Sequence, residues 1–258
     1  MTSRPEELEV TAIHVYPVKG LSPQPLGSVV LSPGDPLPHD RRYAIENGPS
    51  PFEAAAPAHL PKTHFLMLMR NGLLARLRTV FDPATTMLVV EEGGRESVRG
   101  DLSTAHGRAA VEAFLADYCM SELRGPPRIL EAPGFSFSDT DSRVLSIINM
   151  ASVRALEQRI GSPVDPLRFR GNLHVEGLPP WGEFDLVGRT LRSASGVALE
   201  VVKRIDRCAA TNVDPVSGIR DMNIPQTLLR AYDHVDCGIY ARVSVGGTLG
   251  LGERLAVV

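Results

Sequence analysis

The sequence predicts a mainly β protein with a few helices, an α+β fold, and three observations support this class. The 258 residues include 23 Gly and 21 Pro but only 5% aromatic residues, a composition that favours many turns and short strands. Segments of alternating β-branched and apolar residues recur along the chain. Helical features occur in only three places. The length exceeds the usual domain size of roughly 100 to 150 residues, so one large domain or two closely packed domains can form.

In the first half, the strand from Leu8 to Val18 stops at Lys19-Gly20 and should deliver Lys19 into a loop. The four-proline stretch over residues 48–61 is expected to be a surface loop or flap. A helix is predicted over residues 101–123, with Asp101 or Ser103 as its cap. Further strands are expected over residues 26–31, 41–45, 73–81 and 87–92, the last two as a β-hairpin.

In the second half, a helix is predicted from a cap at Ser152 through Ile160, ending at Gly161, and a short helix is expected after Pro225. Strands are expected over residues 172–176, 190–192, 198–204 and 239–245. No composition shift marks a linker, and we place the domain change in the helical region. The predicted domains are residues 1–140 and 141–258.

Charge and motif content exclude several classes of protein. A net charge of -3 gives no whole-chain basic footprint, so no nucleic-acid partner is expected and any cationic site must be local. The sequence has no zinc-type CxxC pair, P-loop, Rossmann fingerprint, HExxH or GxSxG motif. It shows neither a signal-peptide core nor a run of about 18 apolar residues. We therefore expect a cytoplasmic protein without a membrane partner.

The segment DRCAATNVDPVSG, residues 206–218, carries the most chemical information. Its single cysteine, Cys208, leaves a strand and enters a loop with strong turn residues. A free cysteine is most often a buried small hydrophobe, and composition alone favours that interpretation. The other cysteines, Cys119 and Cys237, are expected to be reduced core residues, because an odd number of widely spaced cysteines argues against disulfides.

This segment resembles the signature of the MOSC domain family, in which a cysteine three residues before Thr and six before Asp-Pro coordinates molybdenum. Cys208, Thr211, Asp214 and Pro215 occupy those positions. Other stretches resemble the family in the same order along nearly the whole chain: YPVKG (16–20), DRRY (40–43), FRGNL (169–173), PWGEFDLVG (180–188) and the final GTLGLGERLAVV. The resemblance implies an N-terminal β-barrel-like domain packed on a C-terminal MOSC β-barrel domain that binds a molybdenum pterin cofactor (Mo-molybdopterin).

By this resemblance Cys208 is the metal ligand, and thiolate is a soft ligand suited to such a metal. Arg170 is favoured over Arg207 as the cation beside it, because Arg207 is adjacent in sequence and should face the other way on a strand. Cys208 and Asp214 are the predicted catalytic residues, Asp214 as a proton relay or as a loop-structuring residue. The predicted cofactor-binding residues are Lys19, Gly20, Arg41, Asn149, Arg170, Asn172, Thr211 and Asn212.

Several of these positions leave alternatives open. Arg41 would be a planar fork for phosphate or pterin, but it could instead pair with Asp40, and Arg42 could be the true contact. Arg170 and Asn172 share a face if their segment is extended. Asn149 is either a polar cofactor contact or a residue of the helix entry. Gly20 replaces a frequent serine and Gly171 a frequent proline of the family, so any contact from residue 20 must come from its backbone N–H.

The resemblance implies an oxidoreductase similar to the amidoxime-reducing branch of the family, which removes oxygen from small N-hydroxylated compounds. An external electron-donor protein is implied, because the chain lacks the four-cysteine pattern of a ferredoxin. The alternatives are cofactor sulfuration or maturation, a noncatalytic cofactor carrier, and a cysteine hydrolase pairing Cys208 with His174 or His234.

Overall fold

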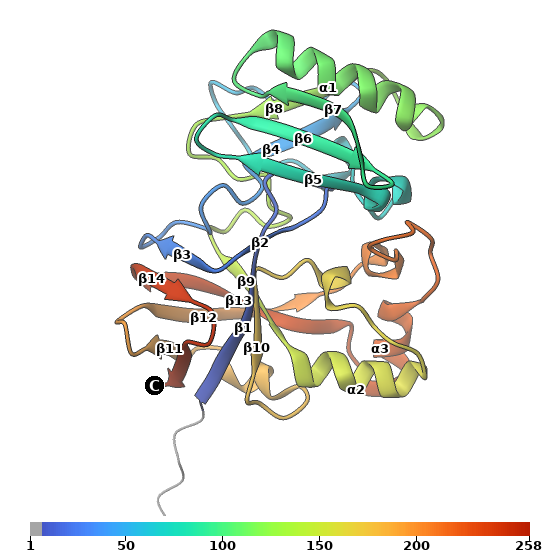
Figure 1. The fold of residues 1–258 in the computed structure, drawn as a ribbon. Coiled ribbons are helices and arrows are strands. Elements are labelled where there is room, and N and C mark those ends of the chain that lie inside the picture. The colour runs from blue at the N-terminus through green and yellow to red at the C-terminus, as the bar shows by residue number, and fades with distance from the viewer. Residues whose placement is uncertain (1–6) are drawn as a thin grey trace, which may run out of the picture.

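The computed structural model describes residues 7–258, which form a closed β-barrel and a second lobe beside it (Figure 1). The barrel closes because the first strand pairs with both the tenth and the last. Around the barrel the order is β1 (Glu7–Val15), β10 (Leu173–Glu176), β9 (Leu145–Asn149), β13 (Asp236–Val245), β12 (Ala198–Asp206), β11 (Thr190–Ser193) and β15 (Arg254–Val257). The mainly β, α+β prediction is therefore confirmed.

Alternation along the strands fills the barrel with apolar side chains. On β13, Ile239, Ala241 and Val243 are buried while the residues between them are more exposed, as the period of two in a strand requires. The core inside the barrel includes Leu8 and Leu173 from opposite halves of the sequence. Two short strands, β3 (Ser28–Leu31) and β14 (Gly247–Gly250), pair with each other outside the barrel. The short strand β2 (Gln24–Leu26) pairs antiparallel with the end of β1.

The upper lobe in Figure 1 is built from residues between β3 and β9. It contains a three-stranded and a two-stranded antiparallel sheet, and the helix α1 (Ala105–Tyr118) packs on β7 and β8. The strands of the first sheet are β5 (Leu77–Asp82), β6 (Met87–Glu92) and β7 (Arg95–Asp101), and those of the second are β4 (Tyr43–Asn47) and β8 (Pro127–Glu131). The predicted hairpin is thus present, whereas its residues 73–76 belong to a 3₁₀ turn.

Both predicted helix caps are wrong by a few residues. Thr104, not Asp101 or Ser103, caps α1 by accepting a hydrogen bond from the Gly107 backbone N–H, because β7 continues through Asp101. Asn149, not Ser152, caps α2 (Met150–Ile160) by accepting from the Ala151 N–H. Position Gly161 ends α2 as predicted, in the left-handed conformation.

Helices α2 and α3 (Ile224–Tyr232) pack together against one side of the barrel through a separate apolar cluster. Six short 3₁₀ helices complete the described elements: η1 (Lys62–His64), η2 (Gly72–Arg76), η3 (Met120–Glu122), η4 (Pro166–Phe169), η5 (Gly182–Leu186) and η6 (Ala209–Asn212). None of the helices in residues 7–258 has the length and apolar character needed to cross a membrane.

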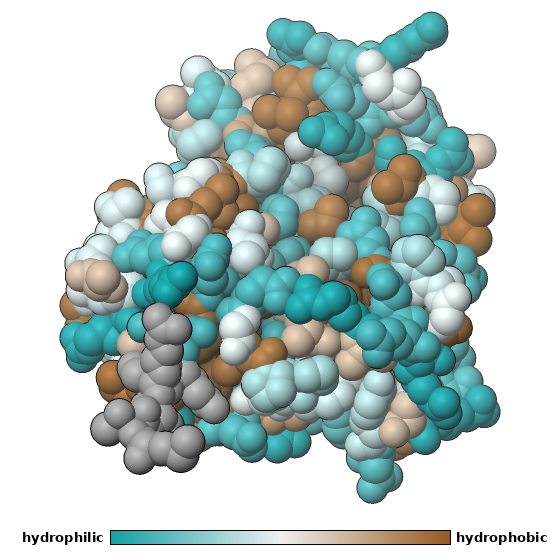
Figure 2. Space-filling model, turned by 60° about the horizontal axis from the view of Figure 1, so that its bottom comes forward, coloured by the Kyte–Doolittle hydropathy of each residue, from teal (hydrophilic) through white to brown (hydrophobic). Residues whose placement is uncertain are grey.

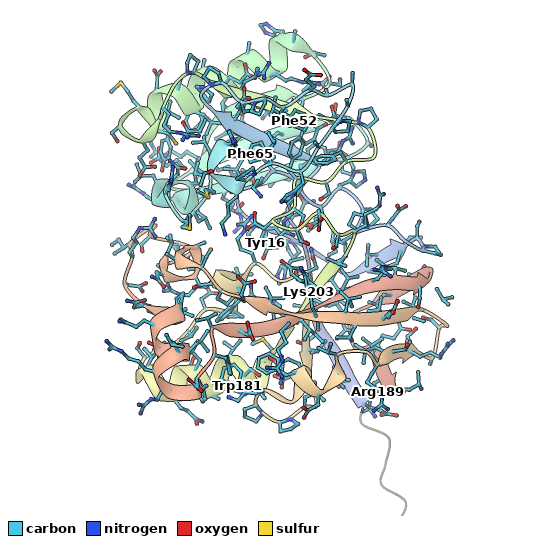
Figure 3. All side chains as sticks on the ribbon, turned by 180° about the vertical axis from the view of Figure 1, so that it is seen from behind. Tyr16, Phe52, Phe65, Trp181, Arg189 and Lys203 are labelled. Atoms are coloured by element: carbon cyan, nitrogen blue, oxygen red, sulfur yellow. The ribbon has the colours of Figure 1, made fainter. Side chains whose placement is uncertain are left out.

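The chain enters the barrel first, builds the upper lobe, and then returns to complete the barrel. Strand β1 therefore lies among strands that come from residues 145–257. The division of the chain at residue 140 stays a prediction. What positions the site is that segments before and after the upper lobe meet at the junction of the two lobes (Figure 3), where Tyr16 and Lys203 both lie.

Candidate functional site

A cavity at the junction of the lobes brings together most of the residues that the sequence singled out. Its lining combines segments from the N-terminal half with the ends of β12 and of η4. The lining residues include seven Lys or Arg but only three Asp: Lys19, Arg41, Lys62, Arg168, Arg170, Lys203 and Arg207, against Asp40, Asp139 and Asp206. In a chain of net charge -3, this is a local cationic site, the only kind that the charge of the sequence allows.

Cys208 lies at this cavity, half-buried, where the chain leaves β12 and begins η6. Its prediction as a loop-mouth residue is borne out in position, since the core positions belong to Cys119 and Cys237, which are both fully buried. Burial raises the pKa of Cys119 to about 11 and that of Cys237 to about 12, so these two thiols stay protonated at neutral pH.

Lys19 follows β1 and points into the cavity wall. Its ammonium group donates to the Phe137 carbonyl oxygen at 2.8 Å and forms an ion pair with Asp139. Burial lowers the pKa of Lys19, and Asp139 opposes that effect. On the other side of the pair, burial would raise the pKa of Asp139, but the charge and hydrogen bond of Lys19 outweigh it and lower the pKa to about 2.

Arg41 and Arg170 both stack on Tyr16, each with its guanidinium carbon 4.3 Å from the ring centroid. Arg41 pairs with Asp40 and donates to the Arg170 carbonyl oxygen at 3.0 Å. The Asp40 pairing, one of the alternatives for Arg41, is therefore present, and the guanidinium lines the cavity at the same time. Arg42 instead pairs with Glu131 and lies outside the lining of this cavity.

Arg170 keeps one nitrogen free in a buried setting. Its Nη1 donates to the Leu21 carbonyl oxygen at 2.8 Å, whereas the buried Nη2 has no hydrogen-bond partner among residues 7–258. Burial, reinforced by the nearby positive charge of Arg41, lowers the pKa of Arg170 to about 10. A buried donor without a partner is costly, so an anionic or polar ligand in the cavity would relieve that cost.

The extended segment expected for Arg170 and Asn172 is wrong, because Arg170 adopts the left-handed conformation at φ 52° after η4. The two side chains have different hydrogen-bond partners. Asn172 lines the cavity, but its Oδ1 accepts from the Ser146 N–H and hydroxyl, and its Nδ2 donates to the His14 carbonyl. Its amide therefore ties together the β1, β9 and β10 segments.

Gly20 lines the cavity at φ +86°, a conformation that favours glycine. A Cβ there would lie 2.8 Å from the Leu66 carbonyl oxygen. The absence of a side chain at this position is thus set by the approach of the upper lobe, which is a reason for glycine independent of any ligand.

The residues after Cys208 mostly hold their own loop. Thr211 lines the cavity, while its hydroxyl donates to the Cys208 carbonyl oxygen at 2.9 Å. Asn212 and Asp214 lie outside the lining: Asn212 accepts from the Ile224 N–H at the start of α3, and Asp214 accepts from the backbone N–H of Val216 and Ser217. These contacts outweigh burial and lower the pKa of Asp214. The loop-structuring alternative for Asp214 is the one that its contacts support.

Asn149 also lies away from the cavity lining. Besides capping α2, its fully buried amide donates to Pro179 and to Glu183 at 2.8 Å each. The helix-entry alternative therefore describes its contacts, and a role in cofactor binding stays a prediction.

The cysteine-hydrolase alternative lacks its geometry, because neither His174 nor His234 lines the cavity that contains Cys208. Burial lowers the pKa of His174 to about 4, and its ring lies 4.8 Å from that of His14. His234 packs against Trp181 and accepts from the Asp236 N–H.

Sequence reasoning missed Lys62, Lys203 and Arg168 as lining residues. Lys62 follows the 48–61 segment, which is itself absent from the lining, and its ammonium group lies 3.8 Å from a carboxylate oxygen of Asp139. Arg168 is held by Asp221 in a bidentate pair at 2.7 and 2.8 Å. A compositional signal was present for the lysines: the sequence contains only three, Lys19, Lys62 and Lys203, and all three line this cavity.

The face of the molecule shown in Figure 2 has no large continuous hydrophobic patch. Hydrophobic residues lie there in small separated groups among hydrophilic ones. Scattered exposed apolar residues are normal for a folded protein, and the cavity at the lobe junction remains the candidate site.

A family model described as MOSC domain matches residues 135–256. Two curated proteins named molybdenum cofactor sulfurase are similar to this chain. The Caenorhabditis briggsae protein is 37% identical over 126 residues, which are 45% of this chain and 17% of that protein. The Caenorhabditis elegans protein is 38% identical over 103 residues, which are 37% and 14%. The alignments thus span less than a fifth of the length of these relatives.

Two solved structures were also found similar. The YuaD protein from Bacillus subtilis has 12% identity, with 98% of this chain and 97% of that chain covered and a TM-score of 0.46. YiiM from Geobacillus stearothermophilus has 17% identity, with 44% and 53% covered and a TM-score of 0.34.

Proposed function

We propose that this chain binds the molybdenum pterin cofactor at the junction of its lobes, with the Cys208 thiolate as a metal ligand. The match of a MOSC domain model to residues 135–256 supports this proposal. The observation that carries the proposal is the meeting of one accessible thiol with cations from both lobes in a single cavity. These residues come from positions as distant as 19, 41, 170 and 208. Burying several positive charges in one cavity costs free energy and contributes nothing to packing, so the arrangement favours a role in binding an anion.

The residues present fit such a ligand. Soft thiolate suits a metal already bound by sulfur, and the excess of Lys and Arg suits the cofactor's phosphate. The unpartnered Nη2 of Arg170 supplies a buried donor for it. In this proposal Lys19, Arg41 and Arg170 hold the phosphate and pterin, the Gly20 backbone and Thr211 complete the wall, and Cys208 holds the metal.

We further propose that the bound cofactor is used to reduce N-hydroxylated compounds. The cofactor, when bound, supplies oxygen-transfer chemistry, and the protein supplies its binding, its orientation and access for a small substrate. Electrons would come from an external donor protein, because the only other thiols, Cys119 and Cys237, are buried in separate clusters of the two lobes.

The test begins with metal analysis of protein made in a host that synthesises the cofactor. We expect molybdenum near one per chain in the wild-type protein and none in a folded Cys208→Ala variant. The loaded wild-type protein, given a one-electron donor, should reduce benzamidoxime to its amidine. Unchanged molybdenum in Cys208→Ala would remove this cysteine from the metal site.

Cofactor sulfuration or transfer is the second candidate, favoured by the printed name of the two curated relatives. In that case Cys208 would hold the cofactor or carry sulfur without reductive turnover. Loaded protein that reduces none of several N-hydroxylated compounds, yet activates a cofactor-free molybdenum enzyme, would decide for this candidate.

A further inference from the structure

Buried Arg170 apart, the cations of the cavity fall into two groups that differ in how far the protein already neutralises them. Lys19, Arg41 and Arg168 each pair with a carboxylate. Arg207 donates to the carbonyl oxygens of Cys237 and Phe169. These side chains are committed to the fold, or to whatever lies deep in the cavity, and they have little freedom to meet a second ligand.

Lys203 belongs to the other group. It is an exposed residue of β12, and in residues 7–258 its ammonium group has neither a salt bridge nor a hydrogen bond. The Nζ atom lies 5.6 Å from the ring centroid of Tyr240, which also lines the cavity. This contact with a neighbouring strand holds the charge beside the cavity without neutralising it. Figure 3 shows Lys203 on the barrel, below Tyr16.

Lys62 is the second weakly neutralised cation. Its Nζ lies 3.8 Å from an oxygen of Asp139, whose other oxygen is occupied by Lys19, and its side chain is 31% exposed. Lys62 and Cys208 line the same cavity. Across the whole lining seven Lys or Arg residues face three Asp residues, so the cavity that contains Cys208 is net positive.

All three lysines of the chain line this cavity. Arginine supplies every cation of the described surface outside this cavity, since the chain has only three lysines. A lysine ammonium is a compact point charge on a flexible stem with three donors, suited to an anion whose position varies between ligands. Buried Lys19 has fixed partners, so Lys62 and Lys203 are the two that remain adaptable.

We propose that Lys203 and Lys62 form an anion-recognition subsite beside Cys208, so that the preferred substrates carry a carboxylate or a similar anionic group next to the reducible nitrogen-oxygen function. This substrate class rests on the proposed function. The subsite itself does not. Two ammonium groups, one weakly neutralised and one without a carboxylate partner among residues 7–258, affect a thiol of the same cavity in the cofactor-free protein as well.

The first experiment uses Cys208 as a reporter in cofactor-free protein. Iodoacetate is anionic and iodoacetamide is neutral. The rate of alkylation by iodoacetate divided by the rate by iodoacetamide, measured at one thiol, therefore rises with the local positive electrostatic potential. Cys119 and Cys237 are buried, and Cys208→Ala gives the background. Removing one nearby charge in Lys203→Gln or Lys62→Gln should lower the ratio by about threefold to tenfold, whereas Lys203→Arg should retain most of it.

Arg204→Gln is the matched control. It removes the same charge from the adjacent position of β12, whose side chain faces the other way and stacks on Phe184. It should leave the alkylation ratio at the wild-type value. An unchanged ratio in both lysine variants would overturn the subsite.

The second experiment uses the loaded enzyme with benzamidoxime and its 4-carboxy derivative. The wild-type protein should favour the carboxylate compound, and Lys203→Gln should reduce that preference in kcat/KM by about tenfold, the worth of one charge-assisted hydrogen bond. A wild-type preference for the neutral compound would overturn the substrate class. A loss of molybdenum from Lys203→Gln would assign this lysine to the cofactor and likewise overturn it.

Failure of the proposed function gives a different result. The loaded enzyme would then turn over neither compound, while the alkylation ratio would still respond to Lys203 and Lys62. The two proposals can therefore fail separately.

Discussion

The deep wall of the cavity, at Lys19 and Arg41, and its edge, at Cys208 and Lys203, differ in the burial and ionic pairing of their side chains. At the wall, Lys19 and Arg41 are largely buried and each is paired with a carboxylate. At the edge, Cys208 is half-buried, and Lys203 is exposed and has no ionic partner within residues 7–258. The wall therefore presents fixed donors whose arrangement is set when the protein folds, and the edge presents adaptable ones. A site that holds one ligand permanently and exchanges another has use for both.

The energetic consequence differs as well. Removing a buried charge leaves its partner uncompensated, which costs several kcal/mol in general, whereas removing an exposed charge costs about 0 to 1 kcal/mol. Variants of Arg41, whose partner Asp40 is also buried, should thus damage both ligand retention and stability. Variants of Lys19, whose partner Asp139 is 51% exposed, should mainly damage ligand retention. Variants at the edge should change recognition alone.

The largest effect is expected at the wall. Lys19→Gln, Arg41→Gln and Arg170→Gln should each weaken cofactor retention by about tenfold or more, because one charge-assisted hydrogen bond contributes about 1.5 to 3 kcal/mol. Pterin and molybdenum content after extended dialysis measures this. Arg42→Gln is the control, since Arg42 pairs with Glu131 outside the cavity lining. Wild-type content in all three wall variants would remove these cations from the cofactor site.

An intermediate effect is expected where the upper lobe holds the Cys208 loop. The Arg220 guanidinium donates to the Leu68 and Met69 carbonyl oxygens at 2.9 and 2.8 Å, and to that of Ala209 at 3.1 Å. Gly72 and Gly218 meet so closely that a Cβ on Gly72 would lie 2.9 Å from the Gly218 oxygen. The loop that carries Cys208 is consequently fixed to both lobes.

Arg220→Gln and, independently, Gly72→Ala should loosen this attachment, with Arg220→Lys restoring part of it. We expect cofactor retention to fall by about threefold to tenfold, the worth of about one hydrogen bond. In cofactor-free protein, Cys208 should become alkylated faster by both charged and neutral reagents. Equal alkylation rates in wild type and in both variants would mean that the barrel alone positions the cysteine.

The smallest effect concerns acid stability through Asp139. Its pKa in the folded protein, about 2, is below the unfolded value, so the stabilisation is present above the unfolded pKa of about 3.9 and is lost as pH falls toward 2. The side chain is 51% exposed, so solvent screens the pair and we expect less than about 1 kcal/mol. Denaturant unfolding of Asp139→Asn should show a shallower loss between about pH 5 and pH 2. A curve parallel to wild type would contradict the assignment.

The sequence by itself determined the fold class and the identity of the chemistry-bearing loop. Alternation along strands such as β13 is local, and turn residues after Cys208 act within a few positions, so both can be recognised without tertiary information. The family resemblance supplied Lys19, Arg41 and Arg170, and all three do line one cavity with Cys208. Arg41 and not Arg42 faces it, a choice that local sequence left open.

Only the tertiary structure decided what each polar residue contacts. Asn149, Asn212 and Asp214 carry suitable groups for a ligand, yet their partners are the backbone and side chains that cap α2, begin α3 and close the loop. Whether an amide binds a ligand or a backbone group depends on residues that are distant in the sequence. The local sequence around the amide does not indicate which residues these are.

The same reason applies to the residues that sequence reasoning missed. Lys62 and Lys203 follow no ligand motif. Lys203 lies on β12 in the same lobe as Cys208, whereas Lys62 lines the same cavity only because the upper lobe packs against the end of β12. The left-handed backbone of Arg170, which the strand pattern did not predict, likewise appears only in the structure. Local sequence fixed the strands and the loop, and long-range contacts decided which charges stand at the wall and which at the edge.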